Sequence, residues 1–253
     1  MVRVSDIYAY LDEIMPFSAQ EEWDNSGLLV GSGETAVTKV LTCLDITLKT
    51  VYEAERIGAQ LVVSHHPVIF HPLKRVMVGT PVYELIRSGI SAVCCHTNAD
   101  NAVNYGTNAA AYELMKKNIA LGEKTPLPDG VGWMCDTPEM SAKELAQLLA
   151  GIFGRAPRYT AGSGSIKRIG FCSGSGGSML ADAAAAGCDA YITGDVKHDV
   201  FVDAENMGAA LYDCGHYETE LPFAAACAGY ISERFTDTAV SVSGDGRDYI
   251  LSL

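Results

Sequence analysis

The feature that most constrains the fold of this chain is a local pattern that occurs four times. A helix-like segment ends at a glycine, a short apolar strand follows, and the strand ends on polar residues. The glycines suit the left-handed position that closes a helix. The copies are IGAQLVVSHH (57–66), SGISAVCCHTNAD (88–100), AGCDAYITGD (186–195) and MGAALYDCGH (207–216). The polar residue follows its glycine by seven positions at His65 and His96, and by eight at Asp195 and His216.

This pattern predicts an α/β fold in which helices alternate with strands. Continuous apolar strands are typical of parallel strands whose two faces are both covered. In such sheets, ligands bind at the carboxyl ends of the strands. The segment KVLTCLDIT (39–47) adds a fifth strand that ends on an acid, Asp45. We therefore expect the His and Asp residues at these ends to form a site.

The middle of the chain predicts a second, smaller α/β domain. TPLPDG (125–130) resembles a linker. The segment SAKELAQLLAGIFG then has a capping box from Ser141 to Glu144 and helical spacing of apolar residues. We predict a metal-binding domain made of residues 1–125 and 195–253, with an inserted domain over 126–194. A helix over 223–234 and strands at TAVSVSG and DYILSL would complete the first domain.

Composition excludes several classes of function. No apolar run approaches the roughly 20 residues of a membrane span, and the first residues lack a signal-peptide core. The formal net charge is -13 without a Lys/Arg-rich run, which argues against general nucleic-acid binding. The eight cysteines form no CxxC pair and are expected to pack as small apolar groups in a reducing cytosol. The sequence thus predicts a cytoplasmic protein without a membrane partner.

Three clusters of residues predict a metal site. His65 and His66 stand at a strand end before Pro67, where their rings can diverge toward two ions; alternatively, one is buried and the other exposed. His96 and Asp100 are four residues apart, as are His216 and Glu220, so that each pair shares a face if a helix begins there. Either pair alone is also typical of a salt bridge at a helix start. All three together, at strand ends, favour a metal centre.

The chemistry of these residues restricts the metal and the number of ions. Imidazole and carboxylate ligands favour Zn, Fe, Mn, Co or Ni over Ca or Cu(I). At least five candidate ligands are enough for two ions bridged by a carboxylate, as in two-metal hydrolases.

Other polar residues have weaker patterns. Asp195 and His198, in GDVKHD, are candidates for orienting or proton-transfer groups, or for surface residues. Asp24, Asn25 and Asp45 are expected near the same crevice. The glycine run SGSGGS (173–178) suggests either a phosphate loop or a tight turn, and it lacks the Lys-Ser/Thr ending of a P-loop.

The chain resembles the GTP cyclohydrolase 1 type 2 family, the Nif-three-like proteins. The matching segments lie in family order along almost the whole chain. They include EEWDNSGLLVG (21–31), GAQLVVSHHPVIFHPLKR (58–75), AVCCHTNAD (92–100), RIGFCSGSGGS (168–178), DAYITGDVKHD (189–199) and ALYDCGHYETE (210–220). The sequence departs from the family at KHD, which replaces the usual double histidine after Lys197, and at Ala99.

The resemblance implies two α/β domains with mixed sheets flanked by helices, a homohexamer, and two divalent metal ions. It implies the metal ligands His65, His66, Asp100, His216 and Glu220. His96 and His198 are the candidate catalytic residues, for proton transfer, and the departure at KHD puts the second in question.

Three functions follow as hypotheses. The first is a metal-dependent hydrolase that opens the imidazole ring of GTP or another nucleotide with activated water. The second is a two-metal phosphoesterase acting on nucleotides. The third is a non-enzymatic scaffold for metal storage, metal insertion or regulation. Formate release, phosphate release, or tight metal binding without turnover would distinguish them.

Overall fold

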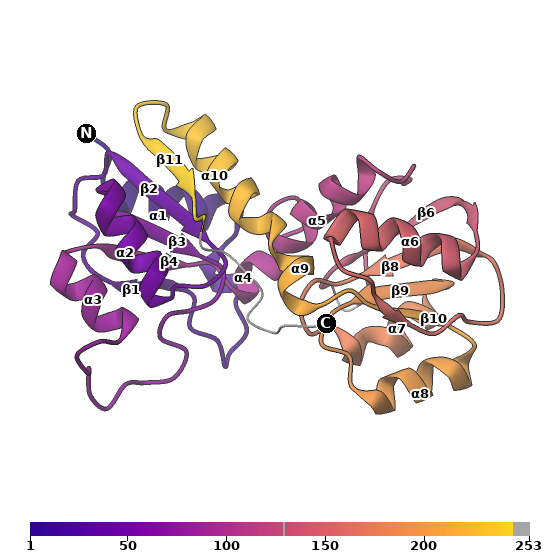
Figure 1. Ribbon diagram of the computed structural model, residues 1–253. Coiled ribbons are helices and arrows are strands. Elements are labelled where there is room, and N and C mark those ends of the chain that lie inside the picture. The colour runs from indigo at the N-terminus through magenta and orange to yellow at the C-terminus, as the bar shows by residue number, and fades with distance from the viewer. Residues whose placement is uncertain (129, 245–253) are drawn as a thin grey trace. The chain divides into compact units, whose positions relative to one another are not determined.

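The computed structural model describes residues 1–128 and 130–244, and the chain forms two compact α/β units (Figure 1). The first unit comprises Met1–Gly106 and the described C-terminal residues from Phe223 onward; the second comprises Thr107–Pro222. Each unit has a mixed sheet with helices on both faces. The predicted fold class is confirmed.

The first unit contains a five-stranded sheet in the order β1-β4-β3-β2-β11. Its strands β2, β3, β4 and β11 are parallel, and the edge strand β1 is antiparallel to β4. Its elements are α1 (Val4–Ile14), η1 (Phe17–Ala19), β1 (Gly27–Val30), β2 (Lys39–Cys43), α2 (Leu48–Ile57), β3 (Leu61–Ser64), α3 (Pro81–Ser88), β4 (Ser91–Cys94), α4 (Thr97–Asp100), α10 (Pro222–Arg234) and β11 (Ala239–Val242).

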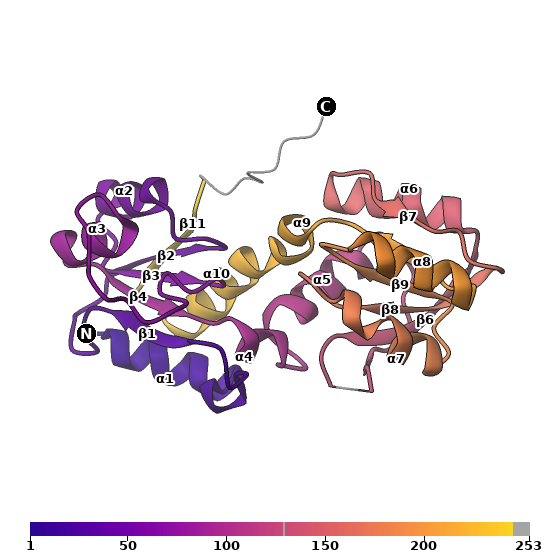
Figure 2. The same cartoon turned by 90° about the horizontal axis from the view of Figure 1, so that it is seen from below.

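The two faces of this sheet are covered by different helices. Leu61 and Val63 of β3 pack with residues of α1 and α10, whereas Val62 packs with residues of α2 and α3. Figure 2 shows α2 and α3 on one side of the strands and α1 on the other. This alternation accounts for the wholly apolar strands, because both faces of each strand are buried.

The second unit contains a six-stranded sheet in the order β5-β6-β8-β9-β10-β7, with β8, β9 and β10 parallel. Helices α5 and α6 pack on one face, and α7 and α8 on the other. Its elements are α5 (Gly106–Lys116), β5 (Thr125–Pro126), β6 (Trp133–Met140), α6 (Ala142–Phe153), β7 (Arg158–Tyr159), β8 (Ile166–Phe171), η2 (Gly177–Met179), α7 (Leu180–Ala185), β9 (Ala190–Thr193), α8 (His198–Met207), β10 (Ala210–Asp213) and α9 (His216–Glu220).

The four predicted glycine turns are present. Gly58, Gly89 and Gly208 end α2, α3 and α8 in the left-handed conformation, and Gly187 has a φ of 83° after α7. Strands β3, β4, β9 and β10 follow them, so the recurring pattern is a real structural repeat.

The boundaries of the units differ from those predicted at 1–125, 126–194 and 195–253. Tyr112 and Met115 of α5 pack with Trp133 of β6, so the second unit begins before the expected linker. Strand β10 pairs with β9 over four residues, which also places residues up to Pro222 in the second unit. The predicted helix at 223–234 and strand at TAVSVSG correspond to α10 and β11. The predicted strand DYILSL lies outside the described residues.

Candidate metal centre

His65 and His66 are placed by the end of strand β3. Their backbone amides donate to the carbonyls of Cys43 and Leu44, so both residues stay fixed beside the end of β2. The ring centroids lie 4.9 Å apart. Nδ1 of the buried His65 lies 2.8 Å from the carbonyl oxygen of Cys95, which can only accept. Nδ1 therefore carries the hydrogen, and Nε2 has the lone pair that a metal requires.

His66 is oriented in the same way by a carboxylate. Its Nδ1 lies 2.8 Å from Oδ1 of Asp45, the acid that follows strand β2. An ionised carboxylate accepts, so Nδ1 donates here as well and Nε2 has the lone pair that a metal requires.

His96 directly precedes helix α4, and Asp24 holds its ring. Nδ1 of His96 lies 2.7 Å from Oδ1 of Asp24, whose Oδ2 accepts from the amide and hydroxyl of Thr97. Burial by itself raises the pKa of Asp24. The hydrogen bonds from His96 and Thr97 outweigh it and hold this pKa well below its ordinary range. Asp24 is therefore a carboxylate at neutral pH and accepts the hydrogen bond from Nδ1 of His96.

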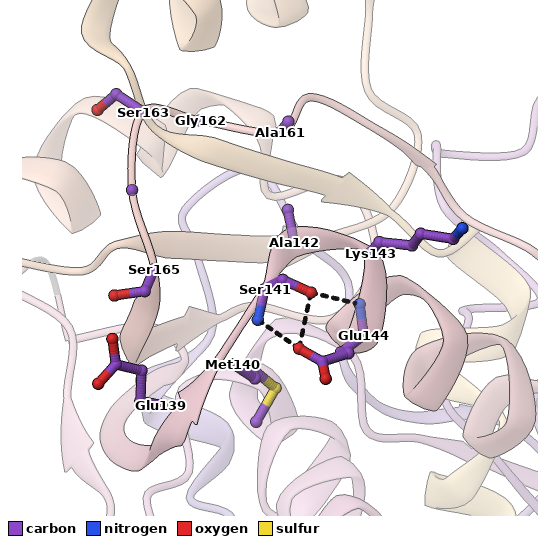
Figure 3. A pocket seen from close by; sticks show the side chains of 11 residues that line it. Glu139, Met140, Ser141, Ala142, Lys143, Glu144, Ala161, Gly162, Ser163 and Ser165 are labelled. Carbon is purple, nitrogen blue, oxygen red and sulfur yellow. Dashed lines mark hydrogen bonds between the residues drawn. The ribbon is translucent and has the colours of Figure 1, made fainter.

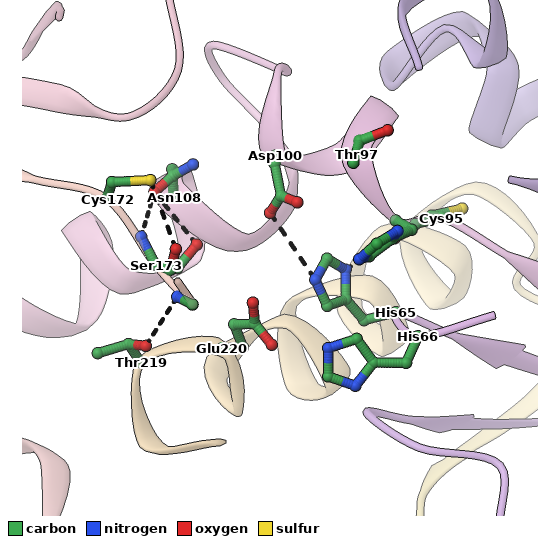
Figure 4. Close-up of polar contacts among 12 residues, drawn as sticks. His65, His66, Cys95, Thr97, Asp100, Asn108, Cys172, Ser173, Thr219 and Glu220 are labelled. Carbon is green, nitrogen blue, oxygen red and sulfur yellow. Dashed lines mark hydrogen bonds and ion pairs between the residues drawn. The ribbon is translucent and has the colours of Figure 1, made fainter. Parts of the chain in front are cut away.

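The three histidines form one group. One ring nitrogen of each of His65, His66 and His96 lies within 4.8 Å of the others. Asp100, at the last position of α4, brings its Oδ1 to 3.8 Å from Nε2 of His65 (Figure 4). The first unit thus gathers imidazole nitrogens and a carboxylate at the carboxyl ends of β3 and β4.

The second unit carries the other predicted pair. His216 and Glu220 begin and end helix α9, and Nε2 of His216 lies 3.0 Å from Oε2 of the buried Glu220. This confirms that the two residues share one face of a helix. Nδ1 of His216 lies 2.8 Å from Oδ2 of Asp195.

Asp195 has an unusual backbone. Its φ is 51°, and it is the only non-glycine residue with a positive φ in the ranges 1–128 and 130–244. Such strain persists where the surroundings fix it and is frequent at functional sites. Here it accompanies a carboxylate that orients a histidine.

The glycine run 173–178 contacts the pair on α9 and does not form an open phosphate cradle. The amides of Ser173 and Gly174 donate to the side-chain oxygens of Asn108 and Thr219, respectively (Figure 4). The amide of Gly176 donates to the hydroxyl of Thr193. These amides are thus not available to a phosphate. Gly174 has a φ of 64°, and a Cβ at this position would lie 2.2 Å from Oε1 of Glu220. A side chain at this position would therefore displace the carboxylate of Glu220.

These residues fit a divalent metal. In each of four histidines an acceptor engages Nδ1, and an oriented imidazole of this kind is what protein metal sites use. Nitrogen and carboxylate donors suit Zn, Fe, Mn, Co or Ni. Buried histidine and glutamate side chains could therefore hold a metal ion.

The remaining predicted residues differ in whether they contact a histidine of the candidate site. Asp24, Asp45 and Asp195, which had weak sequence patterns, each hold a histidine ring. Asn25 donates to the carbonyl of Ile69. His198 is exposed at the first position of α8, and no candidate metal group in the described part of the chain includes it.

A separate pocket lies at the start of α6 (Figure 3), lined by residues 139–144 and 161–165. Ser141 and Glu144 form the predicted capping box there, and the carboxylate of Glu144 accepts from the amide of Ser141 at 2.8 Å. This pocket has no histidine or cysteine, and its helix end is already capped by an acid. It therefore offers neither the ligands of a transition metal nor an open anion site.

Comparisons with known proteins give a family model and named relatives along almost the whole chain. The family model Duf34/NIF3 (NGG1p interacting factor 3) matches residues 2–244. A Clostridium perfringens relative named GTP cyclohydrolase 1 type 2 homolog is 31% identical over 98% of both chains. A Helicobacter pylori relative named GTP cyclohydrolase 1 type 2 is 32% identical, covering 90% of this chain and 91% of its own.

Solved structures show the same fold. A Staphylococcus aureus hypothetical protein superposes with a TM-score of 0.89 at 25% identity, covering 99% of both chains. A Bacillus cereus protein related to NIF3 gives a TM-score of 0.91 at 17% identity, covering 100% of this chain and 99% of that one. Within the described residues, every helix is too short or too polar to cross a bilayer.

Proposed function

Because the chain belongs to the Duf34/NIF3 family, we propose that it is a metal-dependent hydrolase that opens the imidazole ring of GTP or a closely related nucleotide. One observation carries the proposal. The three histidines of the proposed ligand set, His65, His66 and His216, each have Nδ1 engaged by an acceptor, so that Nε2 has the lone pair that a metal requires. The name of the Helicobacter pylori relative supports a guanine nucleotide as substrate.

The proposed ligands of two metal ions are His65, His66 and Asp100 from the first unit, with His216 and Glu220 from the second. The family resemblance supports this combination, and each unit brings its own candidate ligands together: His65 with Asp100, and His216 with Glu220.

His96 and Asp24 are the residues proposed to act in proton transfer beside the metal. A bound divalent ion supplies Lewis acidity and lowers the pKa of water to near neutrality. His96 would accept the proton that the attacking water loses at C8 of the purine and pass it to the ring nitrogen that leaves as the first C8–N bond breaks. A second water would then cleave the resulting formamide, with a proton passed in the same way to the second nitrogen, and C8 would leave as formate. Asp24 stabilises the imidazolium of His96 between these steps, because its carboxylate bonds to Nδ1.

His198 is the second residue predicted to transfer protons. Its exposed position on α8 makes it the weaker candidate, and a comparison of two variants separates the roles. We expect His96→Ala to lower kcat by about 100- to 10,000-fold with its metal retained. An equal loss in His198→Ala would reassign the proton transfer to His198.

Metal content tests the ligand set. Protein purified with Zn or Mn should lose bound metal in His65→Ala and Glu220→Ala, whereas the exposed acid variant Glu13→Ala should match the wild type. Elemental analysis of folded protein, checked by circular dichroism, gives the answer. Unchanged metal content in both ligand variants would refute the set.

Product analysis tests the reaction. Metal-loaded protein supplied with GTP should release formate in a metal-dependent manner. Release of phosphate without formate would favour a nucleotide phosphoesterase. Tight metal binding without turnover on any nucleotide would favour a non-enzymatic scaffold. Light scattering would test the homohexamer that the family resemblance implies.

A further inference from the structure

Two exposed aromatic side chains lie beside the histidine group of the first unit. Trp23 is 60% exposed and Phe70 is 38% exposed. Their ring centroids are 6.0 Å apart, and they lie 6.1 Å and 6.0 Å, respectively, from the ring centroid of His96. We call these two side chains the aromatic rim.

The exposure of Trp23 is informative because a tryptophan is normally used for packing. The only other tryptophan, Trp133, is 2% exposed and stacks on Phe171 at 5.0 Å. Leaving a large aromatic face in water forgoes the stabilisation that burial provides. The rim is thus an apolar surface beside a polar site, as expected of a ligand-binding position.

The rim is held in place by hydrogen bonds of its sequence neighbours. Asp24, next to Trp23, is fixed by His96 and Thr97. Asn25 donates to the carbonyl of Ile69 at 2.6 Å, which ties the segment of Trp23 to that of Phe70. The bond joins two segments 44 residues apart in the chain, two residues after Trp23 and one residue before Phe70. A preorganised aromatic surface loses little entropy when a ring stacks on it.

We propose that Trp23 and Phe70 bind the planar purine ring of the substrate and hold it against His96. This inference rests on the proposed function and deepens it. Ring opening takes place on the base itself, so the base must lie within reach of the histidine group. A phosphoesterase would instead place a phosphate there and leave the rim without a role in the reaction. Any purine offers a π face, and aromatic stacking of a base is worth about 5- to 100-fold in affinity.

Binding measurements on the metal-loaded full chain test the rim. The probes are 8-oxo-GTP, whose oxidised C8 yields no formate, and inorganic tripolyphosphate, which has no base. Trp23→Ala should raise the Kd of 8-oxo-GTP about 5- to 100-fold in calorimetry and leave that of tripolyphosphate within about twofold. Trp23→Phe, which retains a ring, should recover most of the affinity. Tyr52→Ala is the matched control, because Tyr52 is 48% exposed on α2 of the same unit.

Fluorescence gives an independent readout. Binding of 8-oxo-GTP should quench the exposed Trp23, and the residual signal of Trp133 in the Trp23→Phe variant should not respond. An absence of 8-oxo-GTP binding by the wild type would overturn the proposal. The proposal would also be overturned if Trp23→Ala lost affinity for both probes equally. It would be overturned as well if Trp23→Ala changed the oligomeric state but kept its affinity for 8-oxo-GTP, because the rim would then contact another protein chain.

The failures of the two proposals are distinguishable. If Trp23→Ala releases formate from GTP with an unchanged KM, the rim is refuted and the hydrolase stands. If the rim binds 8-oxo-GTP through Trp23 but the wild type neither forms a ring-opened product from GTP nor releases formate, the ring opening is refuted and the base-binding surface stands.

Discussion

Nδ1 of His66 lies 2.8 Å from Oδ1 of Asp45, so the acid after strand β2 sets the ring of the histidine after β3. The same relation joins His96 to Asp24 and His216 to Asp195. In all three, the carboxylate fixes the tautomer and increases the electron density on Nε2. Asp45 and Asp195 therefore prepare their histidines for a metal, and Asp24 prepares His96 for proton transfer; none of the three acids belongs to the proposed ligand set.

Removal of such an acid should weaken metal binding. We expect Asp45→Ala to reduce the affinity for Zn by about 10- to 100-fold, because the ring of His66 loses its orienting carboxylate. Competition with a chelating dye measures this effect. Glu13→Ala, an exposed acid on α1, is the control. An affinity equal to that of the wild type would show that Asp45 has no influence on the site.

The approach of Gly174 to Glu220 gives a second prediction. In Gly174→Ala the new Cβ would overlap Oε1 of Glu220, so the carboxylate must move and metal content should fall about tenfold. Two control variants separate displacement of the Glu220 carboxylate from a general loss of stability. Gly187→Ala has a φ of 83° with open space around its Cβ, and should cost stability alone, about 1 kcal/mol. Gly177→Ala meets only Val200 at 3.8 Å and should change little.

Elemental analysis and urea unfolding of the three glycine variants provide the comparison. If Gly187→Ala loses as much metal as Gly174→Ala, general destabilisation explains the result, and the close approach to Glu220 does not matter.

Local features of the site could be predicted from the sequence. The glycine that closes each helix and the apolar strand after it are neighbours in the sequence. A short stretch of sequence is therefore enough to predict that His65 and His216 stand at strand ends. The i,i+4 spacing of His216 and Glu220 likewise predicted a contact that is present at 3.0 Å.

Distant pairings could not be predicted in this way. Asp24 lies 72 residues before His96, and no periodicity connects them. Sheet pairing is equally non-local. Strand β10 joins β9 through backbone hydrogen bonds that no side-chain pattern encodes. The boundary predicted at residue 195 therefore differs from the end of the compact second unit at Pro222. The aromatic rim depends on the bond from Asn25 to Ile69, 44 residues away.

The capping box of α6 predicts a purely structural effect. Ser141→Ala removes the hydroxyl that accepts from the amide of Glu144, at a cost of about 1 kcal/mol to the stability of the second unit (Figure 3). Urea unfolding followed by Trp133 fluorescence measures this loss. Metal content should not change, because the helix lies outside the candidate centre; a parallel loss of metal would contradict that separation.

The buried thiols of the second unit predict an alkaline loss of stability. Burial raises the pKa of Cys135 to about 12 and that of Cys188 to about 11, from an ordinary value of 9.0. The folded state therefore holds these protons more tightly than the unfolded chain. The stability linked to the neutral thiols is complete below pH 9 and is lost as the pH rises through about 11 to 12, by on the order of 1 kcal/mol per pH unit for each thiol.

Unfolding in urea at pH 8 and pH 10.5 should accordingly show a larger drop for the wild type than for the double variant Cys135→Ala/Cys188→Ala, although the variant starts from a lower stability. Trp133, two residues before Cys135, reports the transition. The slope with pH is the informative quantity, because the cavity left by alanine lowers stability equally at both values. Identical slopes would mean that the two thiols do not ionise on unfolding in this range, and burial would then not control their protonation.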